Sequence, residues 1–237
     1  FYPTTLLAQA DSCIGSKSSI NSGEIKNILG TFFPPEYIVI DVDFLSTLND
    51  EDINSGIGEM IKVHAIDAPE SLNKISSDYN KLLSDNNVLE SYIYNSLLIK
   101  RKLIELDEFD QGPRNVMNYG HSFGHAIESA TNFEIPHGIA VTIGMDMANY
   151  IAVKLDSSTD DNYQRMHAVM KKNYRLSQHV KIDVDLLMRA LQKDKKNTAT
   201  QLRLILPNSD GKIVIRLYDN DVNFIRFVED FITKVKC

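Results

Sequence analysis

NYGHSFGHAIES, at residues 118–129, places His121 and His125 four positions apart in a segment that otherwise has the composition of a helix. Each residue of an α-helix advances by about 100°, so positions four apart lie about 40° from one another on the same face. Gly120 and Gly124 each weaken a helix by about 1 kcal/mol relative to Ala. The two glycines therefore indicate that another part of the chain comes close to the backbone of this segment.

A third histidine raises the question of a metal site. His137 follows a proline in IPHGIAV, at the start of the next predicted helix, and two antiparallel helices could bring it beside His121. A further carboxylate would complete a catalytic metal site with an open position, and Glu59 in GIGEMIKVHAI is the natural candidate. A His-x-x-x-His pair by itself is more often two partly exposed polar residues. It is also not the His-Glu-x-x-His motif, because Ser122 follows the first histidine. Both interpretations stay open on spacing alone.

The sequence predicts a short α/β part at residues 1–49, followed by a mainly helical part at residues 50–237. YIVIDVDFL at 37–45 is rich in β-branched residues and predicts a strand, which the prolines of FFPPEY precede in a turn. Asn49 or Asp50 is a candidate N-cap for the first long helix. The segment at 138–155 is apolar nearly all round, as a helix at the centre of a domain would be, and hydrophobic patterning predicts the later elements. These are helices at about 70–85, 88–106, 114–131, 138–155 and 221–235, and two strands at 202–207 and 212–217 that NSDG joins in a hairpin.

Composition excludes several classes of protein. The net charge of −7 argues against non-specific nucleic-acid binding. No apolar run approaches the roughly 20 residues of a membrane span. Cys13 and Cys237 are the two cysteines, so a disulfide framework is not expected and a cytoplasmic location is the default. A chain of 237 residues can bury a sizeable core without a structural metal, so any metal is expected to be catalytic.

Basic residues recur beside glycine or asparagine, in GSKSSIN, IKNILG, GEMIK, GPRN and DKKN. An acidic chain that places cations in such segments can build a pocket for a phosphate or a carboxylate. Each one alone is more often a solvated surface cation. The residues concerned are Lys17, Lys26, Lys62, Lys100, Arg114 and Lys195. His64, His167 and His179 have no comparable context and are interpreted as surface or structural.

Several segments together resemble 3-dehydroquinate synthase and the wider sugar-phosphate cyclase family. They are PTTLLAQADSCIGSKSSIN, KNILGTFFPP, GIGEMIK, DEFDQGPRNVMNYGHSFGHAIE, HGIAVTIGM and DKKN, in this order from Pro3 to Asn197. The resemblance implies a dehydroquinate synthase-like fold, α/β overall. It also implies an NAD-binding domain of which residues 1–49 are the C-terminal part and whose N-terminal part precedes the sequence given.

The resemblance also implies roles for individual residues. Glu59, His121 and His137 match the family's zinc ligands, and His125 matches a pocket histidine that takes part in proton transfer. Residues that match those holding the substrate's phosphate, carboxylate and hydroxyls are Lys17, Asn27, Lys62, Lys100, Arg114, Asn118 and Lys195. Residues that match the wall contacting NAD are Thr4, Thr5, Asp11, Lys17, Lys26, Phe44, Leu45, Ser46 and Thr47.

The implied reaction is the conversion of a heptulosonate or heptulose 7-phosphate into a carbocycle, with elimination of phosphate. It comprises oxidation of a ring hydroxyl by NAD, β-elimination, return of the hydride, ring opening and an intramolecular aldol step. The metal, Zn²⁺ or Co²⁺, polarises the reacting oxygens, and cationic side chains bind the phosphate and balance developing charge. The implied enzyme is a cytoplasmic homodimer.

The sequence departs from the family pattern at several positions. Ile139 stands where dehydroquinate synthases typically have Glu, Ser16 where a second glycine is usual, and Val63-His64 where Tyr-Gly is common; Cys13 is also atypical. The resemblance therefore defines the reaction class more closely than the substrate, and another cyclase of secondary metabolism or polysaccharide synthesis stays open. So do a metal-dependent alcohol dehydrogenase of the glycerol dehydrogenase type and a non-catalytic binding protein.

Overall fold

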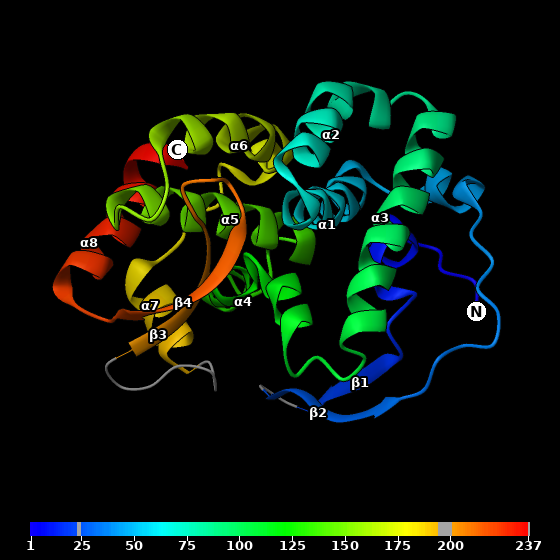
Figure 1. The fold of residues 1–237 in the computed structure, drawn as a ribbon, viewed down its shortest axis with the longest axis horizontal. Helices are drawn as coiled ribbons and strands as arrows, with labels where there is room; N and C mark the ends of the chain where they lie inside the picture. The colour runs from blue at the N-terminus through cyan, green and yellow to red at the C-terminus, as the bar shows by residue number, and fades with distance from the viewer. Residues whose placement is uncertain (23–24, 194–200, 237) are drawn as a thin grey trace.

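The computed structural model of the chain describes residues 1–22, 25–193 and 201–236, and the side chains of residues 21–27 are outside the described part. Helices dominate the described chain, and two small antiparallel sheets form from residues toward the two ends of the sequence; both lie along the lower side of the molecule in Figure 1. The α-helices are α1 Asp50–Asp67, α2 Pro69–Leu82, α3 Asn86–Leu106, α4 His121–Ala130, α5 His137–Lys154, α6 Asp160–Asn173, α7 Val184–Gln192 and α8 Val222–Asp230. The strands are β1 Lys17–Ser22, β2 Ile25–Phe32, β3 Gln201–Pro207 and β4 Ile213–Asp219. Short helical segments of other types are η1 Ala8–Ser12, η2 Val42–Thr47, η3 Pro113–Asn118, η4 Arg175–Ser177 and η5 Phe231–Val235.

The predicted strand at residues 37–45 is wrong. Residues 37–41 have no regular secondary structure, and 42–47 form the 3₁₀ helix η2, whose first turn is capped when Asp41 accepts a hydrogen bond from the backbone N–H of Asp43. Val39 donates one backbone hydrogen bond to Phe1, but the two segments form no ladder in the described structure. A β-branched run becomes a strand only where another strand pairs with it, and here β1 and β2 pair with each other instead, with Lys17 opposite Phe32.

The first three long helices are confirmed near the predicted boundaries. Asn49 caps α1 by accepting a hydrogen bond from the backbone N–H of Asp52, and Asp85 caps α3 in the same way. These side chains satisfy N–H groups that have no partner within the helix. The predicted late hairpin is also confirmed, with Gln201 of β3 opposite Asp219 of β4. The predicted last helix divides into α8 and the π-helical turn η5.

The single helix predicted at 114–131 is wrong, because the segment breaks into η3 and α4. Gly120 between them has φ of +76°, a left-handed conformation that ends a helix. A Cβ built on Gly120 would lie 2.5 Å from Cγ of Met145, so the break also lets α5 approach closely. His121 becomes the first residue of α4, with His125 one turn later.

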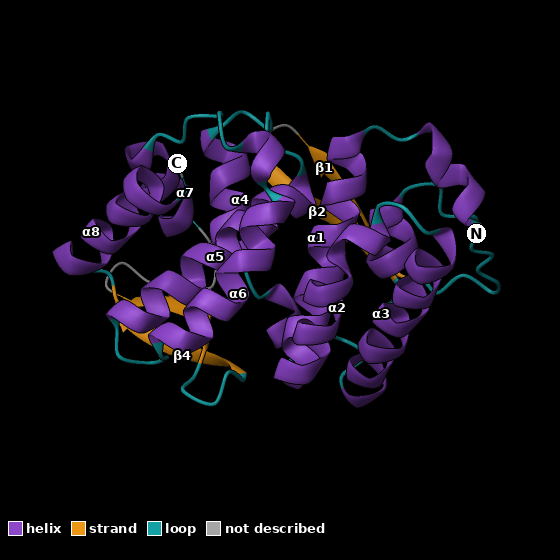
Figure 2. Cartoon of the chain, turned by 90° about the horizontal axis from the view of Figure 1, so that it is seen from above, coloured by secondary structure: helices purple, strands orange, loops and turns teal. Residues whose placement is uncertain are grey.

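Close approach between helices fixes the centre of the molecule. A Cβ on Gly58 of α1 would lie 2.3 Å from the carbonyl oxygen of Gly138 of α5, and one on Gly144 would lie 2.2 Å from the carbonyl oxygen of Gly120. Helix α5 is buried around nearly its whole circumference, as predicted, with α1, α4 and α6 against it (Figures 1 and 2). The start of α5 therefore lies against the middle of α1, and the start of α4 lies against α5.

Residues 1–48 share the core of the rest of the chain, because Leu6, Ala10 and Leu45 belong to the same buried apolar cluster as the helices.

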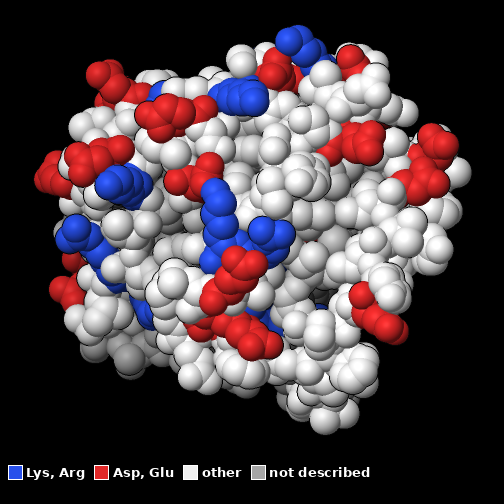
Figure 3. All heavy atoms as spheres, turned by 45° about the vertical axis from the view of Figure 1, so that its right-hand side comes forward, with Lys and Arg blue, Asp and Glu red and all other residues white. Residues whose placement is uncertain are grey.

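On the face seen in Figure 3, acidic and basic side chains are interspersed and much of the surface carries neither. In the described part of the chain, no helix has the length and apolar character needed to cross a membrane.

Candidate metal and anion site

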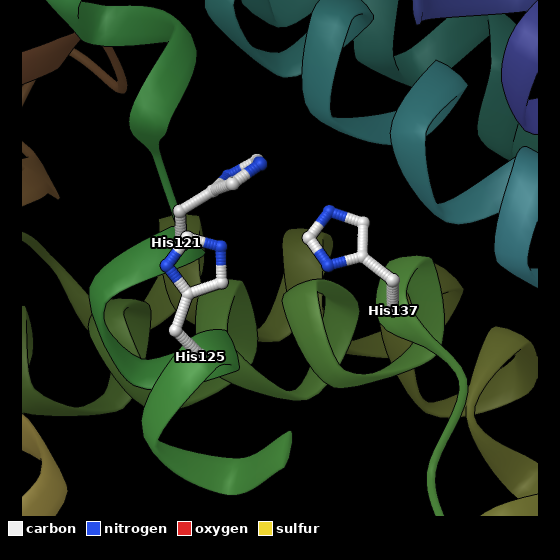
Figure 4. A group of neighbouring side chains, drawn as sticks. All are labelled: His121, His125 and His137. Carbon is white, nitrogen blue, oxygen red and sulfur yellow. The ribbon is translucent and has the colours of Figure 1, made fainter. Parts of the chain in front are cut away.

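Three imidazoles meet where α4 and α5 begin. His121 and His125 project from successive turns of α4, and His137 faces them from the first turn of α5 (Figure 4). One ligand nitrogen from each lies within 4.8 Å of the others. His121 and His137 are partly buried, whereas His125 is exposed. The His-x-x-x-His pair is therefore part of a convergent cluster.

Glu59 reaches this cluster from α1. Its Oε1 atom lies 3.7 Å from Nε2 of His121 and 3.7 Å from Nε2 of His137. Two ligands of a tetrahedral zinc are about 3.3 Å apart, from zinc–ligand distances of about 2.0 Å. The side chain of Glu59 is 1% exposed, and Oε1 has no hydrogen-bond partner among the described residues.

A buried carboxylate oxygen without a partner is costly, and a divalent cation between it and the two imidazoles would satisfy it. The trio assigned from the resemblance thus has donor types, burial and spacing that fit zinc or cobalt. His125 is the remaining imidazole of the cluster, and its exposure places it on the solvent side.

Partners behind the imidazoles hold them in place. Nδ1 of His137 lies 3.2 Å from Oε1 of Glu128, and Nδ1 of His121 lies 3.2 Å from the carbonyl oxygen of Tyr119. Hydrogen bonds at Nδ1 leave Nε2 as the ligand atom and fix the ring. The sequence reasoning missed Glu128. The sequence feature that could have found Glu128 is its position three residues after His125 on the same helix, which places the two side chains on one side of α4.

The titration of the two imidazoles differs. Burial, together with the charge of Lys62, holds the pKa of His121 well below its usual range, so the ring is neutral and its nitrogen can bind a metal. For His137, burial acts against the charged form, but the hydrogen bond to Glu128 and the charge of Glu59 outweigh it and raise the pKa. Burial raises the pKa of Glu59 to about 7 against the opposing charge of Lys62.

Two lysines adjoin the candidate ligands. The ammonium group of Lys62 donates to Oε2 of Glu59 and lies 3.2 Å from Oδ2 of Asp11. That of Lys100 lies 2.6 Å from Oδ1 of the same aspartate. Burial acts to raise the pKa of Asp11, but the two lysines outweigh it and bring the pKa well below the usual value. The structure therefore brings together Glu59, Lys62, Lys100 and Asp11 as one charged network.

Arg114 and Lys17 lie at the edge of this region. Arg114 is buried, and its guanidinium donates to the carbonyl oxygens of Glu108 and Gly15. Lys17 is exposed and pairs with Asp110 at 2.7 Å. Asn118 is partly buried at the end of η3 and donates to the carbonyl oxygen of Asn115. These side chains are engaged with the protein itself in this structure.

The other residues assigned from the resemblance are more dispersed. Of the residues assigned to contact NAD, Leu45 is buried in the core and Asp11 is partly buried. The others with described side chains are exposed, namely Thr4, Thr5, Lys17, Phe44, Ser46 and Thr47. Lys26 and Asn27 lie on β2, but their side chains are outside the described part, and Lys195 falls outside the described residues altogether. Their assignments stay predictions.

The remaining histidines lie away from the cluster. His64 is buried, with Nδ1 2.7 Å from the hydroxyl of Ser71, and His167 pairs with Asp146. His179 is exposed. The interpretation of His64 as a structural residue fits its place inside the helical core.

Fold and site together define a helical protein with a candidate divalent-metal site beside a cluster of cations. Residues 56–197 match the model of the 3-dehydroquinate synthase C-terminal region, and residues 1–55 match that of the 3-dehydroquinate synthase N-terminal region. The chain belongs to the 3-dehydroquinate synthase family.

Individual relatives agree with this assignment. The chain is similar to the 3-dehydroquinate synthase of Clostridium perfringens strain 13, with 40% identity over 94% of this chain and 63% of the relative. The enzyme of the same name from Helicobacter pylori strain HPAG1 is 39% identical over 90% of this chain and 61% of its own length. The chain thus spans somewhat more than three fifths of the length of these relatives.

Solved structures show the same fold. A 2-deoxy-scyllo-inosose synthase complexed with carbaglucose-6-phosphate, NAD⁺ and Co²⁺ matches with a TM-score of 0.81, at 24% identity, over 96% of this chain and 65% of that one. The 2-epi-5-epi-valiolone synthase of Streptomyces hygroscopicus subsp. jinggangensis 5008, with NAD⁺ and Zn²⁺ bound, matches with a TM-score of 0.79 at 26% identity, over 96% of this chain and 63% of that one.

Proposed function

We propose that the chain supplies the metal- and substrate-binding part of a 3-dehydroquinate synthase-like enzyme, a carbon–oxygen lyase that closes a heptulosonate or heptulose 7-phosphate into a carbocycle with loss of phosphate. One observation carries the proposal. A buried carboxylate oxygen of Glu59 lies 3.7 Å from Nε2 of both His121 and His137, and Lys62 adjoins the same carboxylate. Family membership and the names of the relatives support the reaction class.

Glu59, His121 and His137 would hold Zn²⁺ or Co²⁺, and the metal would supply Lewis-acid polarisation of substrate oxygens. The solved structures with bound NAD⁺ and Co²⁺ or Zn²⁺ support this choice of cofactors. Glu128 and the carbonyl oxygen of Tyr119 orient the two imidazoles from behind. The exposed His125, beside both of them, is placed to exchange a proton with a substrate hydroxyl.

The cations would bind the anionic groups of the substrate. Lys62 and Lys100 already share the carboxylate of Asp11, so their positions are set before a ligand arrives. Arg114 and Lys17 would contribute from the region of Gly15 and Asp110. Positive charge held in place costs no reorganisation when negative charge develops on the leaving phosphate. Asn118, Asn27 and Lys195 complete the proposed substrate set.

Residues 1–49 would belong to a nucleotide-binding part, with Thr4, Thr5, Asp11, Lys17, Lys26 and residues 44–47 on the side facing NAD. The shared core described above would then join the two parts rigidly. We further propose that the enzyme is a cytoplasmic homodimer, as the resemblance implies.

A second candidate is a related cyclase acting on another sugar phosphate. Ile139, fully buried on α5 two residues after His137, stands where the family resemblance leads one to expect a carboxylate. The loss of that group changes the polarity of the pocket without removing the metal donors or the lysines. A glycerol dehydrogenase-type activity is less well supported, because such an enzyme would not need the cluster of Lys62 and Lys100.

The test is a phosphate-release assay on the full-length protein with NAD, Zn²⁺ and 3-deoxy-arabino-heptulosonate 7-phosphate. We expect release by the wild type and by His179→Ala, which alters an exposed histidine outside the cluster, and loss of release in His121→Ala. Bound zinc, measured in the same samples, should fall in His121→Ala alone. Release from another heptulose phosphate only would favour the second candidate. Full activity and full zinc in His121→Ala would disprove both.

A further inference from the structure

A cavity of about 340 Å³ lies between α5, α6 and η5, and none of the candidate metal ligands lines it. Its volume is within the range of small-ligand pockets. Basic side chains from each of the three elements line it, Lys154, Lys171 and Lys234, whereas Asp160 is the one carboxylate among the described lining residues. Such an excess of positive charge stands out in a chain whose net charge is −7.

A buried carboxylate holds a histidine at the wall of this cavity. Nδ1 of His167 lies 2.8 and 3.0 Å from the two carboxylate oxygens of Asp146, which is fully buried on α5 and also accepts a 2.7 Å hydrogen bond from the hydroxyl of Tyr174. With Nδ1 directed at Asp146, Nε2 is the nitrogen of His167 that is left to form a hydrogen bond with a ligand. An aspartate in this position fixes the orientation of the ring.

The helix dipole by itself explains part of the clustering of lysines around the cavity. Lys154 and Lys171 lie in the last turns of α5 and α6, where cations interact favourably with the helix dipole. Lys171 also donates to the carbonyl oxygen of Val235, and Lys234 pairs with Asp230 at 2.6 Å. The dipole explains neither the cavity nor the buried aspartate that directs His167 along its wall.

We propose that this cavity is a second anion site, which binds a phosphate group, either inorganic phosphate or the monoester of a small metabolite, through Lys154, Lys171 and Nε2 of His167. A phosphate dianion offers several acceptor oxygens, which suit donors that arrive from different elements. The site is separate from the proposed catalytic site. Helix α5 begins at His137 and carries Asp146 nine residues later, about 13 Å along its axis.

The test follows the ring resonances of His167 by NMR while inorganic phosphate or glycerol 3-phosphate is added to the chain. We expect saturable shifts with at least one of the two ligands, with a Kd on the order of 1 mM or tighter. The ligand that binds more tightly identifies the source of the phosphate group. Because the readout is at His167, the result does not depend on catalytic activity.

Matched variants complete the experiment. Lys154→Ala and Lys171→Ala should each weaken binding about tenfold, the effect of losing one hydrogen bond to a charged group. Lys172→Ala is the control, because this neighbouring lysine lies on the same helix but lines a different cavity. Absence of shifts at His167 with both ligands, or an equal loss in Lys172→Ala, would overturn the proposal.

Discussion

Glu128→Gln tests how much the residue behind His137 contributes to metal binding. Oε1 of Glu128 lies 3.2 Å from Nδ1 of His137, and the glutamate is 5% exposed. Glutamine has the same size and keeps an oxygen that can accept the Nδ1–H hydrogen bond. The variant therefore removes the negative charge while leaving the packing of α4 nearly unchanged.

The magnitude follows from the position of Glu128 behind His137, a proposed metal ligand. Loss of such a partner typically lowers metal affinity 10- to 100-fold. Because glutamine preserves the acceptor, we expect a loss near the lower limit, about tenfold or about 1.4 kcal/mol. Glu128→Ala removes the acceptor as well, leaves Nδ1 without it and should approach a 100-fold loss.

The assay is a competition titration of zinc between the chain and a chromophoric chelator, carried out near pH 8 so that protons compete little for His137. Glu134→Gln is the matched control, because Glu134 is exposed beyond the end of α4, and its zinc affinity should equal that of the wild type. Thermal unfolding without metal checks that each variant folds. Unchanged zinc affinity in a folded Glu128→Ala variant would refute the assignment of Glu128 as a positioning residue.

Three further perturbations test the packing and the electrostatics. Gly58→Ala would place a Cβ 2.3 Å from a backbone oxygen of α5. We therefore expect the free energy of unfolding to fall by roughly 1–3 kcal/mol and zinc binding to weaken. An unchanged melting temperature would contradict the close approach of α1 to α5. Burial lowers the pKa of His64 from 6.5 to about 4, so the unfolded chain takes up this proton at a higher pH than the folded chain. The free energy of unfolding should therefore fall by up to about 3 kcal/mol as the pH drops from 6.5 to 4. Denaturant titrations should find a smaller pH dependence in His64→Leu. Lys236→Met removes a buried ammonium group that donates to three backbone carbonyl oxygens, and it should lower the free energy of unfolding by roughly 2–3 kcal/mol. A decrease below about 0.5 kcal/mol, the usual scatter for surface changes, would show that these hydrogen bonds stabilise the fold little.

The site illustrates how family resemblance and geometry complement each other. Spacing alone left His121 and His125 as either ligands or tolerated polar residues. The resemblance selected Glu59, His121 and His137, and the structure brings their donor atoms together around a carboxylate oxygen that no described residue hydrogen-bonds. Neither residue spacing nor the family resemblance suggested Glu128, because its contact with His137 depends on how α4 and α5 face each other.

Local chemistry determined much of the fold from the sequence. The N-cap at Asn49, the amphipathic periodicity of α3, the largely apolar composition of α5 and the turn between β3 and β4 are each decided within a few residues. Only the tertiary structure decided that 37–45 is not a strand, because a strand requires a partner that the sequence does not name. The break at Gly120, the approach of α1 to α5 through Gly58, and the convergence of the candidate ligands likewise depend on which helices touch. Hydrophobic periodicity shows which face of an element is buried, whereas the contacts between distant elements arise only when the whole core packs at once.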